Sequence, residues 1–450
     1  MLKKIVFAGT QHPSFAQGSA ALAALAGLAI ATKQVERVTE KIGRERVEQR
    51  DRAVADFQKI PLTTRCESPI SLPPDLAVVE MDGGRLQIFD RRAAASGPVA
   101  DEDDEDESEE RPGHWREDKI GVLMTMTGTA SSDDPCPEIP EHFVDPTRIL
   151  KLAREIKGSV TVTEDATGGG PGSTTGGDPV PTARFTPQPR VRTTVATRGK
   201  AKRFGAILAQ AAYARGFAAA RRKAFVADGA ATNWKTQRRW FSDYTAVLDF
   251  IHALSYVFAA AMAGRGLRVG WEAYVVWIQQ VWGGHVEDVI AALESRQSEV
   301  GTPEPDDPET GPRVVVAEAL SYLRNHAARM CYPDYRKAGL PITSSHMEST
   351  VKLFNRRLKG TEKFWSEEGA EAVLQLRADF LSETEPLERF WRDRQECATG
   401  RRFYRRSGWR RQVTFPVVHP PAKSRLNTWG GSGRHPWPRR GCRRSGSSGG

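Results

Sequence analysis

Leu76-Ala-Val-Val-Glu-Met81 is a mostly apolar, β-branched stretch that ends at Asp82-Gly83-Gly84. This composition predicts a buried strand, and the glycine pair predicts a turn after it. Arg85 to Phe89 alternates in character and predicts a second strand. Lys119 to Thr127 predicts a third, in which the apolar residues at alternate positions from Val122 to Met126 share one face. The sequence therefore predicts three strands of hairpin type.

Helices and strands alternate after the third strand. A helix is predicted over 203–223, a strand over 224–227, a helix over 232–241, a strand over 245–248 and a helix over 250–262. Three hairpin-type strands followed by helix, strand, helix, strand and helix is the order of an RNase H-like sheet. The expected fold class is therefore α/β, with a mixed sheet.

Two further segments read as helical. Residues 14–60 are expected to form helices separated at Gly27, and the second carries Lys33, Arg37 and Lys41. This pattern fits a helix-turn-helix, but from sequence alone it favours the alternative, an ordinary helical hairpin with a solvated polar face. Residues 270–330 are expected to insert more helices into the sheet order. Their apolar stripe has the spacing of a buried face rather than of a base-stacking surface; its members are Tyr274, Trp277, Ile278, Val281 and Trp282.

Composition sets limits on the rest of the chain. The 65 Lys and Arg against 56 Asp and Glu give a net charge of +9, but thirteen of the cations lie in 397–450, where there is no Asp or Glu. The remainder therefore carries −4, so only local basic faces support nucleic-acid binding. The five cysteines are scattered, which indicates a reducing compartment. The sequence contains no run of about 20 strongly apolar residues, so it predicts no membrane span.

Three segments are expected to lack regular structure. Residues 101–112 open with nine acids in ten residues, and 168–195 are rich in Gly, Pro and Thr. Residues 407–450 are composed largely of Arg, Gly, Ser, Pro and Trp. None of these compositions buries enough apolar surface to offset chain entropy. The last segment is either a DNA-binding tail or a frame-shifted terminus.

Three carboxylates carry the predicted chemistry. Asp82 and Asp228 each end a predicted strand and are followed by glycine, and Glu348 lies near the start of a predicted helix over 345–359. Carboxylates on different elements can hold two Mg²⁺ ions roughly 3.5–4 Å apart, which suits in-line phosphoryl transfer. A turn aspartate is more often a helix cap or part of an Asx-turn, so spacing alone leaves both interpretations open.

The helix that begins at 345 also carries a basic stripe. Lys352, Asn355, Arg356 and Lys359 follow Glu348 at helical spacing and share its face. This stripe is expected to contact DNA phosphates beside the metal ions. The alternative is an exposed helix with a Glu–Lys pair four residues apart.

Several blocks resemble bacterial insertion-sequence transposases of the ISKra type, which are related to Mutator-like transposases. Tyr335-Arg-Lys-Ala-Gly-Leu-Pro-Ile-Thr-Ser-Ser-His-Met-Glu-Ser349 resembles the block of their third carboxylate. Val79-Glu-Met-Asp-Gly-Gly84 resembles the first-Asp strand, and Trp115-Arg-Glu-Asp-Lys119 the strand after it. Phe225-Val-Ala-Asp-Gly-Ala230 resembles the second-Asp strand, and Leu248-Asp-Phe-Ile-His-Ala253 a block that pairs a polar residue with His. The resemblance covers roughly residues 15–406.

The resemblance implies a DDE transposase with Asp82, Asp228 and Glu348 as catalytic metal ligands. It implies two Mg²⁺ or Mn²⁺ ions, and terminal inverted repeats and target DNA as double-stranded partners. The enzyme is expected to form a homo-oligomer on DNA in the bacterial cytoplasm, away from membranes. Asp249 competes with Asp228 for the second position, and His252 either contacts a phosphate or only pairs with Asp249. Two alternatives remain: a decayed remnant that binds DNA without cutting it, and a DNA-binding regulator.

The expected organisation follows from these segments. Residues 1–65 form the N-terminal helical unit, 66–265 the first part of the catalytic core, 266–335 a helical insertion, 336–406 the last catalytic helix with C-terminal helices, and 407–450 the basic tail. The DNA-binding residues expected on the two basic helices are Lys33, Arg37, Lys41, Lys352, Arg356 and Lys359.

Overall fold

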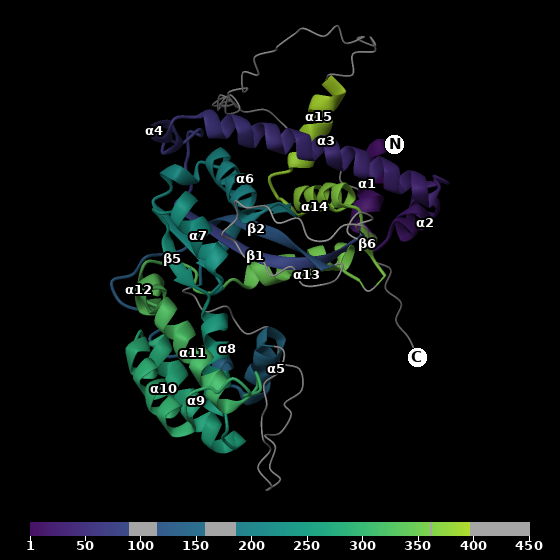
Figure 1. The fold of residues 1–450 in the computed structure, drawn as a ribbon. Helices are drawn as coiled ribbons and strands as arrows, with labels where there is room; N and C mark the ends of the chain where they lie inside the picture. The colour runs from purple at the N-terminus through teal and green to yellow at the C-terminus, as the bar shows by residue number, and fades with distance from the viewer. Residues whose placement is uncertain (90–114, 158–185, 361, 397–450) are drawn as a thin grey trace, which may run out of the picture. The chain divides into compact units, whose positions relative to one another are not determined.

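A mixed sheet of six strands organises the described part of the chain (Figure 1). The computed structural model describes residues 1–89, 115–157, 186–360 and 362–396. Its strands are β1 (Leu76–Ile88), β2 (Trp115–Thr127), β3 (Gln188–Thr197), β4 (Arg222–Ala227), β5 (Thr245–Leu248) and β6 (Phe364–Trp365). They lie in the order β3-β2-β1-β4-β5, and β6 pairs with β1. β1 is antiparallel to β2 and parallel to β4, so the predicted α/β class with a mixed sheet is confirmed.

Helices precede, separate and follow the strands. The first group is α1 (Leu2–Gln11), α2 (Phe15–Ala26), α3 (Thr32–Lys59) and α4 (Leu62–Arg65). Between the strands lie α5 (Pro146–Lys157), α6 (Ala201–Ala214) and α7 (Ala231–Trp240), and α8 (Phe250–Met262) follows β5. The rest are α9 (Leu267–Trp282), α10 (Val286–Val300), α11 (Pro312–His326), α12 (Tyr332–Lys337), α13 (Ser345–Leu358), α14 (Glu367–Leu381) and α15 (Pro386–Glu396). Within the described ranges, none of these helices has the length and apolar character needed to cross a membrane.

β1 passes through Gly83 and Gly84 without turning, so the predicted turn and the separate strand over 85–89 are wrong. Gly83 pairs with Lys119 and Gly84 with Asp118 in a register that continues unbroken to Gln87. The glycines allow close approach instead of a turn. A Cβ on Gly84 would lie only 2.8 Å from an oxygen of Asp118, so a side chain at this position would push that carboxylate aside.

The third hairpin-type strand lies inside the predicted linker over 168–195. β3 occupies Gln188–Thr197, so the linker prediction is wrong where the structure describes it. The β-branched residues from Val191 to Val195 favour a strand, and their pairing with β2 overrides the Pro- and Thr-rich composition. Residues 101–112, the remainder of the linker up to 185 and the tail over 407–450 lie outside the described residues.

The unpaired side of β3 is covered by the segment after α14. The backbone N–H of Glu383 donates to the carbonyl of Arg192, at 2.9 Å, and the N–H of Thr194 donates to Ser382 Oγ, also at 2.9 Å. These bonds satisfy groups that an exposed edge strand would leave open to pairing with another chain. The segment that follows α14 therefore closes this edge of the sheet, and α14 itself packs against β3.

The two faces of the sheet carry different helices. A Cβ on Gly121 of β2 would touch Leu208 and Phe204 of α6, which places α6 on that face. α13 packs against β1 and β2, and Figure 1 shows it on the other side of the sheet from α14 and α3. The predicted helix over 203–223 ends early, at Ala214, because Gly216 adopts a left-handed conformation and a short 3₁₀ turn follows.

The N-terminal helices pack on the core rather than apart from it. α3 lies along α14 and α6. Two buried ion pairs fix it there, Arg46 to Asp379 at 2.8 Å and Arg50 to Glu371 at 2.8 Å. α1, which the sequence analysis did not predict, joins α2 and α3 through an apolar cluster of Ile5, Ala8, Leu22 and Val35.

The helical insertion contains the aromatic stripe as a buried face, as predicted. All five of its residues are at least nine-tenths buried: Tyr274, Trp277, Ile278, Val281 and Trp282. The Tyr274 hydroxyl donates to the carbonyl of Phe143, at 2.8 Å. Because these side chains are buried, the stripe is part of the protein core and does not stack on bases. α5, which was not predicted, packs against α8 in the same region.

Candidate active site

The registers of three parallel strands bring three aspartates into one row. Glu80 of β1 pairs with Val226 of β4, so extending that register by two residues places Asp82 beside Asp228. Ala227 pairs with Leu248 of β5, so one further residue places Asp228 beside Asp249. Residues in register on neighbouring strands project to the same face, about 4.8 Å apart. Asp228 and Asp249 follow the carboxyl ends of β4 and β5, whereas Asp82 lies in the middle of β1 and does not end its strand as predicted. The three acids nevertheless form a row on one face.

Glu348 reaches this row from α13, which packs against β1 and β2. Burial raises the pKa of Glu348, and the charge of Asp249 raises it further, while Lys352 opposes the rise. Burial likewise raises the pKa of Asp82 to about 6, with Asp228 as the next contributor and Glu348 adding to it. The three acids that the sequence singled out are thus within electrostatic reach of one another.

Asp228 is half-buried and held by its own turn. Its Oδ1 accepts from the N–H of Ala230, at 3.0 Å, and from Asn233 Nδ2, at 2.6 Å. Among the described residues all of its hydrogen bonds reach this one oxygen, so Oδ2 is not occupied by the turn. The Asx-turn predicted as an alternative is present, and it leaves half of the carboxylate for another partner.

Gly229 is required by packing against the insertion. A Cβ at this position would lie 2.2 Å from Cε2 of Tyr322 and 3.0 Å from Nε2 of His326, both on α11. Tyr322 stacks on Tyr256 of α8, with ring centroids 3.6 Å apart and an interplanar angle of 9°. Because Gly229 has no side chain, the aromatic side chains of the insertion can pack directly against the turn that follows Asp228. This packing is the clamp that holds the turn in place.

Substitution Gly229→Ala is expected to lower the free energy of unfolding by about 1–3 kcal/mol, because the added methyl overpacks a partly buried aromatic stack. Gly83→Ala is the control, since its Cβ meets nothing nearer than a carboxylate oxygen of the exposed Glu117, at 3.3 Å. Urea unfolding of both variants measures the difference. Equal stability of the two variants would refute the clamp.

Both carboxylate oxygens of Asp249 are occupied by protein groups. It is fully buried, caps α8 by accepting from the N–H of Ile251, at 2.9 Å, and accepts from Nδ1 of His252, at 3.2 Å. The hydroxyl of Ser344, which precedes α13, donates to the same oxygen as His252. Asp249 therefore joins the start of α8 to the start of the helix that carries Glu348.

His252 carries positive charge beside the acids. Burial alone lowers its pKa, but the hydrogen bond and charge of Asp249, with further contributions from Asp228 and Asp82, raise it to about 9. One quarter of the side chain is exposed. The ring therefore pairs with Asp249 and also presents a cationic edge to the row of carboxylates.

The His252 ring is expected to titrate near pH 9 in the metal-free protein, followed by NMR of its Cε1 proton. Because this pKa lies above the ordinary value near 6.5, the pair stabilises the fold fully below about pH 6.5 and loses that effect as pH rises through 9. Asp249→Asn should return the midpoint toward the ordinary range. A wild-type midpoint at or below 6.5 would contradict the assigned contacts.

Two acids that the sequence analysis missed share this face. Glu80, two residues before Asp82, is fully buried, and neither of its oxygens has a hydrogen-bond partner in the described chain. Burial, followed by the charge of Asp249, raises its pKa well above the ordinary value. Asp118 of β2 lies opposite Gly84 and is 4% exposed. Its even spacing from Val122 and Met124 was the available signal, since alternate residues share a face.

The acids are close but not assembled around an ion. Among the described residues, no three His, Cys, Asp or Glu side chains are grouped so that they would hold a metal. Asp82 instead accepts from the N–H of Gly83, at 2.6 Å, and Asp228 turns one oxygen to its own loop. Oxygen donors suited to a hard divalent cation are nevertheless abundant on this face.

The six predicted DNA-contact residues are exposed. They lie on α3 and α13: Lys33, Arg37, Lys41, Lys352, Arg356 and Lys359. Lys352 is 3.9 Å from Glu348, so the predicted pair four residues apart is present, and two-thirds of the Lys352 side chain is still exposed. Lys33 pairs with Glu36 at 2.6 Å. These cations are accessible to phosphates.

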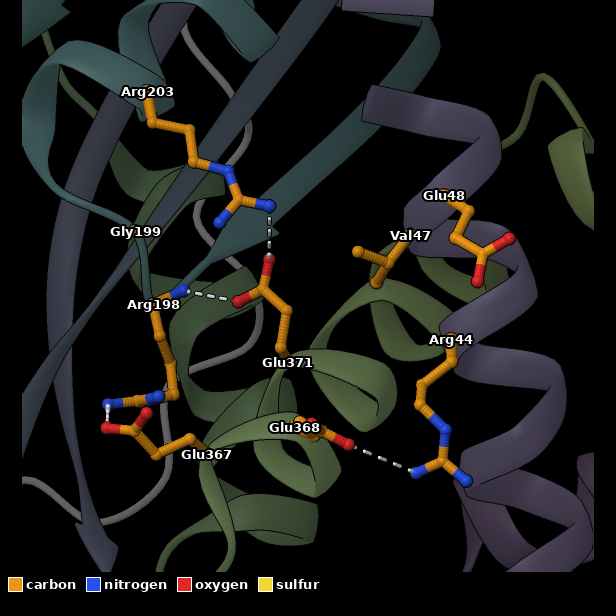
Figure 2. Close-up of a pocket in the computed structure, with 9 residues that line it drawn as sticks. All are labelled: Arg44, Val47, Glu48, Arg198, Gly199, Arg203, Glu367, Glu368 and Glu371. Atoms are coloured by element: carbon orange, nitrogen blue, oxygen red, sulfur yellow. Dashed lines mark hydrogen bonds and ion pairs between the residues drawn. The ribbon is translucent and has the colours of Figure 1, made fainter. Parts of the chain in front are cut away.

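A surface hollow lies between α3, the start of α14 and the segment after β3 (Figure 2). Its charged groups neutralise one another: Arg198 lies 3.4 Å from Glu367, and Arg203 lies 4.0 Å from Glu371. None of the acids of the candidate active site lines it: Glu80, Asp82, Asp118, Asp228, Asp249 and Glu348 all lie elsewhere. The hollow is therefore a seam between helices and not part of the candidate active site.

Comparison with known proteins adds no assignment. No protein-family model matches this chain, and no curated protein matches it. The site is accordingly interpreted from its own residues.

Proposed function

We propose that this chain is a DDE transposase with an RNase H-like catalytic core, which cuts and joins double-stranded DNA. The observation that carries the proposal is the common face shared by Asp82 of β1, Asp228 at the end of β4 and Glu348 of α13. The element order supports it as well, since three antiparallel strands precede the alternating helices and two parallel strands. The likeness of the sequence blocks to ISKra-type transposases supplies the substrate class.

The residues present suit divalent metal ions. Asp82, Asp228 and Glu348 offer carboxylate oxygens, which Mg²⁺ and Mn²⁺ prefer, and the buried Glu80 leaves two oxygens without partners. Bound ions would activate an attacking water or hydroxyl and stabilise the oxygen leaving phosphorus. Asp228 is the better second ligand, because both oxygens of Asp249 are already occupied by protein groups.

The surrounding residues then have distinct roles. Asp249 positions His252 and the start of α13, and the cationic edge of His252 attracts a DNA phosphate. Lys352, Arg356 and Lys359 bind the backbone beside the site, while Lys33, Arg37 and Lys41 of α3 bind the terminal repeats. In the reaction, water attacks phosphorus and a 3′ oxygen leaves as a hydroxyl. That 3′-hydroxyl then attacks a phosphorus of target DNA, and the P–O bond to the target strand's own 3′ oxygen breaks, so that oxygen leaves as a new 3′-hydroxyl. The proposed setting is a homo-oligomer on DNA in the bacterial cytoplasm.

The test is incubation of the full chain with a linear duplex that contains its coding region and both flanks. In Mg²⁺ the protein should produce breaks with 3′-hydroxyl ends at paired inverted repeats, and EDTA should prevent them. Repeat-specific binding without breaks would instead identify a decayed remnant. Binding at sites unrelated to paired repeats, with no break in Mg²⁺ or Mn²⁺, would identify a regulator.

A further inference from the structure

Asp118 is a buried acid of the active-site face to which the proposed function gives no role. The register of β1 and β2 sets Asp118 opposite Gly84 and Asp82 opposite Ile120. Asp118 and Asp82 are therefore diagonal neighbours on one face, within reach of each other's side chains. Its chain neighbours Glu117 and Lys119 project to the other face, where they form an ion pair of 2.6 Å.

The carboxylate of Asp118 is directed across β1. A Cβ added to Gly84 would lie 2.8 Å from Oδ1 and 3.1 Å from Oδ2, so both oxygens lie over the glycine. Gly84 is thus the position that lets this side chain lie flat against the strand that carries Asp82. Any larger residue at 84 would displace the carboxylate from the active-site face.

Asp118 has no partner that accounts for its burial. It is 4% exposed, and among the described residues no cation forms an ion pair with its carboxylate within 4.0 Å; the hydrogen bond assigned to it comes from its own backbone N–H. Other buried acids are matched: Asp379 is held by Arg46 at 2.8 Å, and Glu371 by Arg50 at 2.8 Å. An unpaired buried charge is costly unless a cation joins it. Glu80, on the same face, is buried with no hydrogen-bond partner for either carboxylate oxygen.

We infer that Asp118 is a fourth carboxylate of the Asp82 site and contributes directly to binding of a divalent cation there. The inference rests on the proposed metal-dependent function, and it extends the ligand set from the strand ends to β2. Burial raises the pKa of Asp118 to about 6, and the charges of Glu117 and Asp82 add to the rise, while the charge of Lys359 opposes it. Lys359 is exposed on the end of α13, so it does not replace a bound ion inside the face.

The test is the affinity of the full-length protein for Mn²⁺, measured by the loss of the free-ion EPR signal without DNA. Asp118→Asn should weaken binding by about 10–100-fold, the range seen when groups around a metal are removed. Glu117→Gln is the matched control, because this neighbour is half-exposed and faces away; its affinity should stay within about twofold of wild type. Thermal unfolding of each variant establishes that it is folded.

The outcomes separate this inference from the proposed function. If Asp82→Asn abolishes Mn²⁺ binding while Asp118→Asn binds like wild type, the transposase site stands and the role of Asp118 is refuted. In that case Asp118 is a neutral buried acid for which Asn is an adequate replacement. If the wild-type protein binds no Mn²⁺, both are refuted. Loss of affinity in Asp118→Asn with retention in Glu117→Gln supports the inference.

Discussion

Asp82→Asn, Asp228→Asn and Glu348→Gln are each expected to reduce DNA cleavage in Mg²⁺ by more than about 100-fold, because loss even of groups around a metal ligand costs 10–100-fold. DNA affinity should not fall, since phosphate contacts come from cations and removing a carboxylate removes repulsion. Gel analysis of the products and fluorescence anisotropy of a labelled repeat end measure the two effects separately. Full-rate cleavage by Glu348→Gln would show that this helix does not carry a ligand.

Lys352→Ala is the complementary control for this series. Its side chain is two-thirds exposed and lies 3.9 Å from Glu348, so its removal changes charge beside the site without creating a cavity. Weaker binding is expected, with a salt dependence about one unit shallower in log–log slope. Unchanged salt dependence would remove Lys352 from the DNA-contact surface while leaving the carboxylate prediction intact.

Arg336→Met is expected to lower the free energy of unfolding by about 3–5 kcal/mol, because it removes one member of a buried ion pair and leaves Asp134 without its partner. The Arg336 side chain is fully buried, and Nε and Nη2 both donate to Asp134. Nη2 also donates to the carbonyl of Trp282, at 3.0 Å, and the guanidinium lies 4.1 Å from the centroid of that ring. The residue thus joins α12 to α9 and to the loop after β2. Urea denaturation of the full chain measures the loss.

Arg324→Met is the matched comparison for this variant. Arg324 pairs with Glu294 on neighbouring helices, but about half of each side chain is exposed. Solvent screens such pairs, so the expected cost is about 0–1 kcal/mol. A similar loss in both variants would mean that burial does not distinguish the two arginines.

Much of the sheet was predictable because its parallel strands are short, apolar and flanked by helices. β4 and β5 fall where the sequence places them, within two residues at the start of β4. The failures share one cause: local composition was given more weight than pairing. Gly83 and Gly84 look like a turn, yet β2 pairs with both, and the Pro- and Thr-rich start of β3 becomes a strand because β2 offers it a partner.

The sequence predicts those members of the site that directly follow an apolar run of residues. Asp82 and Asp228 each follow an apolar run, and parallel register brings such residues together. Asp118 was missed because its strand was expected to begin at Lys119, one residue later. The sequence also did not predict that both oxygens of Asp249 are occupied, since one of the partners is Ser344, 95 residues away. The clamp of Tyr322 on Gly229 likewise joins elements that are distant in sequence.

The most direct test of a shared metal site needs no DNA substrate. Fe²⁺ is added in place of Mg²⁺ to the full chain, and ascorbate with peroxide then generates hydroxyl radicals that cut the backbone near the bound ion. The account predicts cuts near Asp82, Asp228 and Glu348 together, all suppressed by excess Mg²⁺ and lost in Asp82→Asn. Cuts near one of these residues alone, or none that Mg²⁺ suppresses, would contradict it.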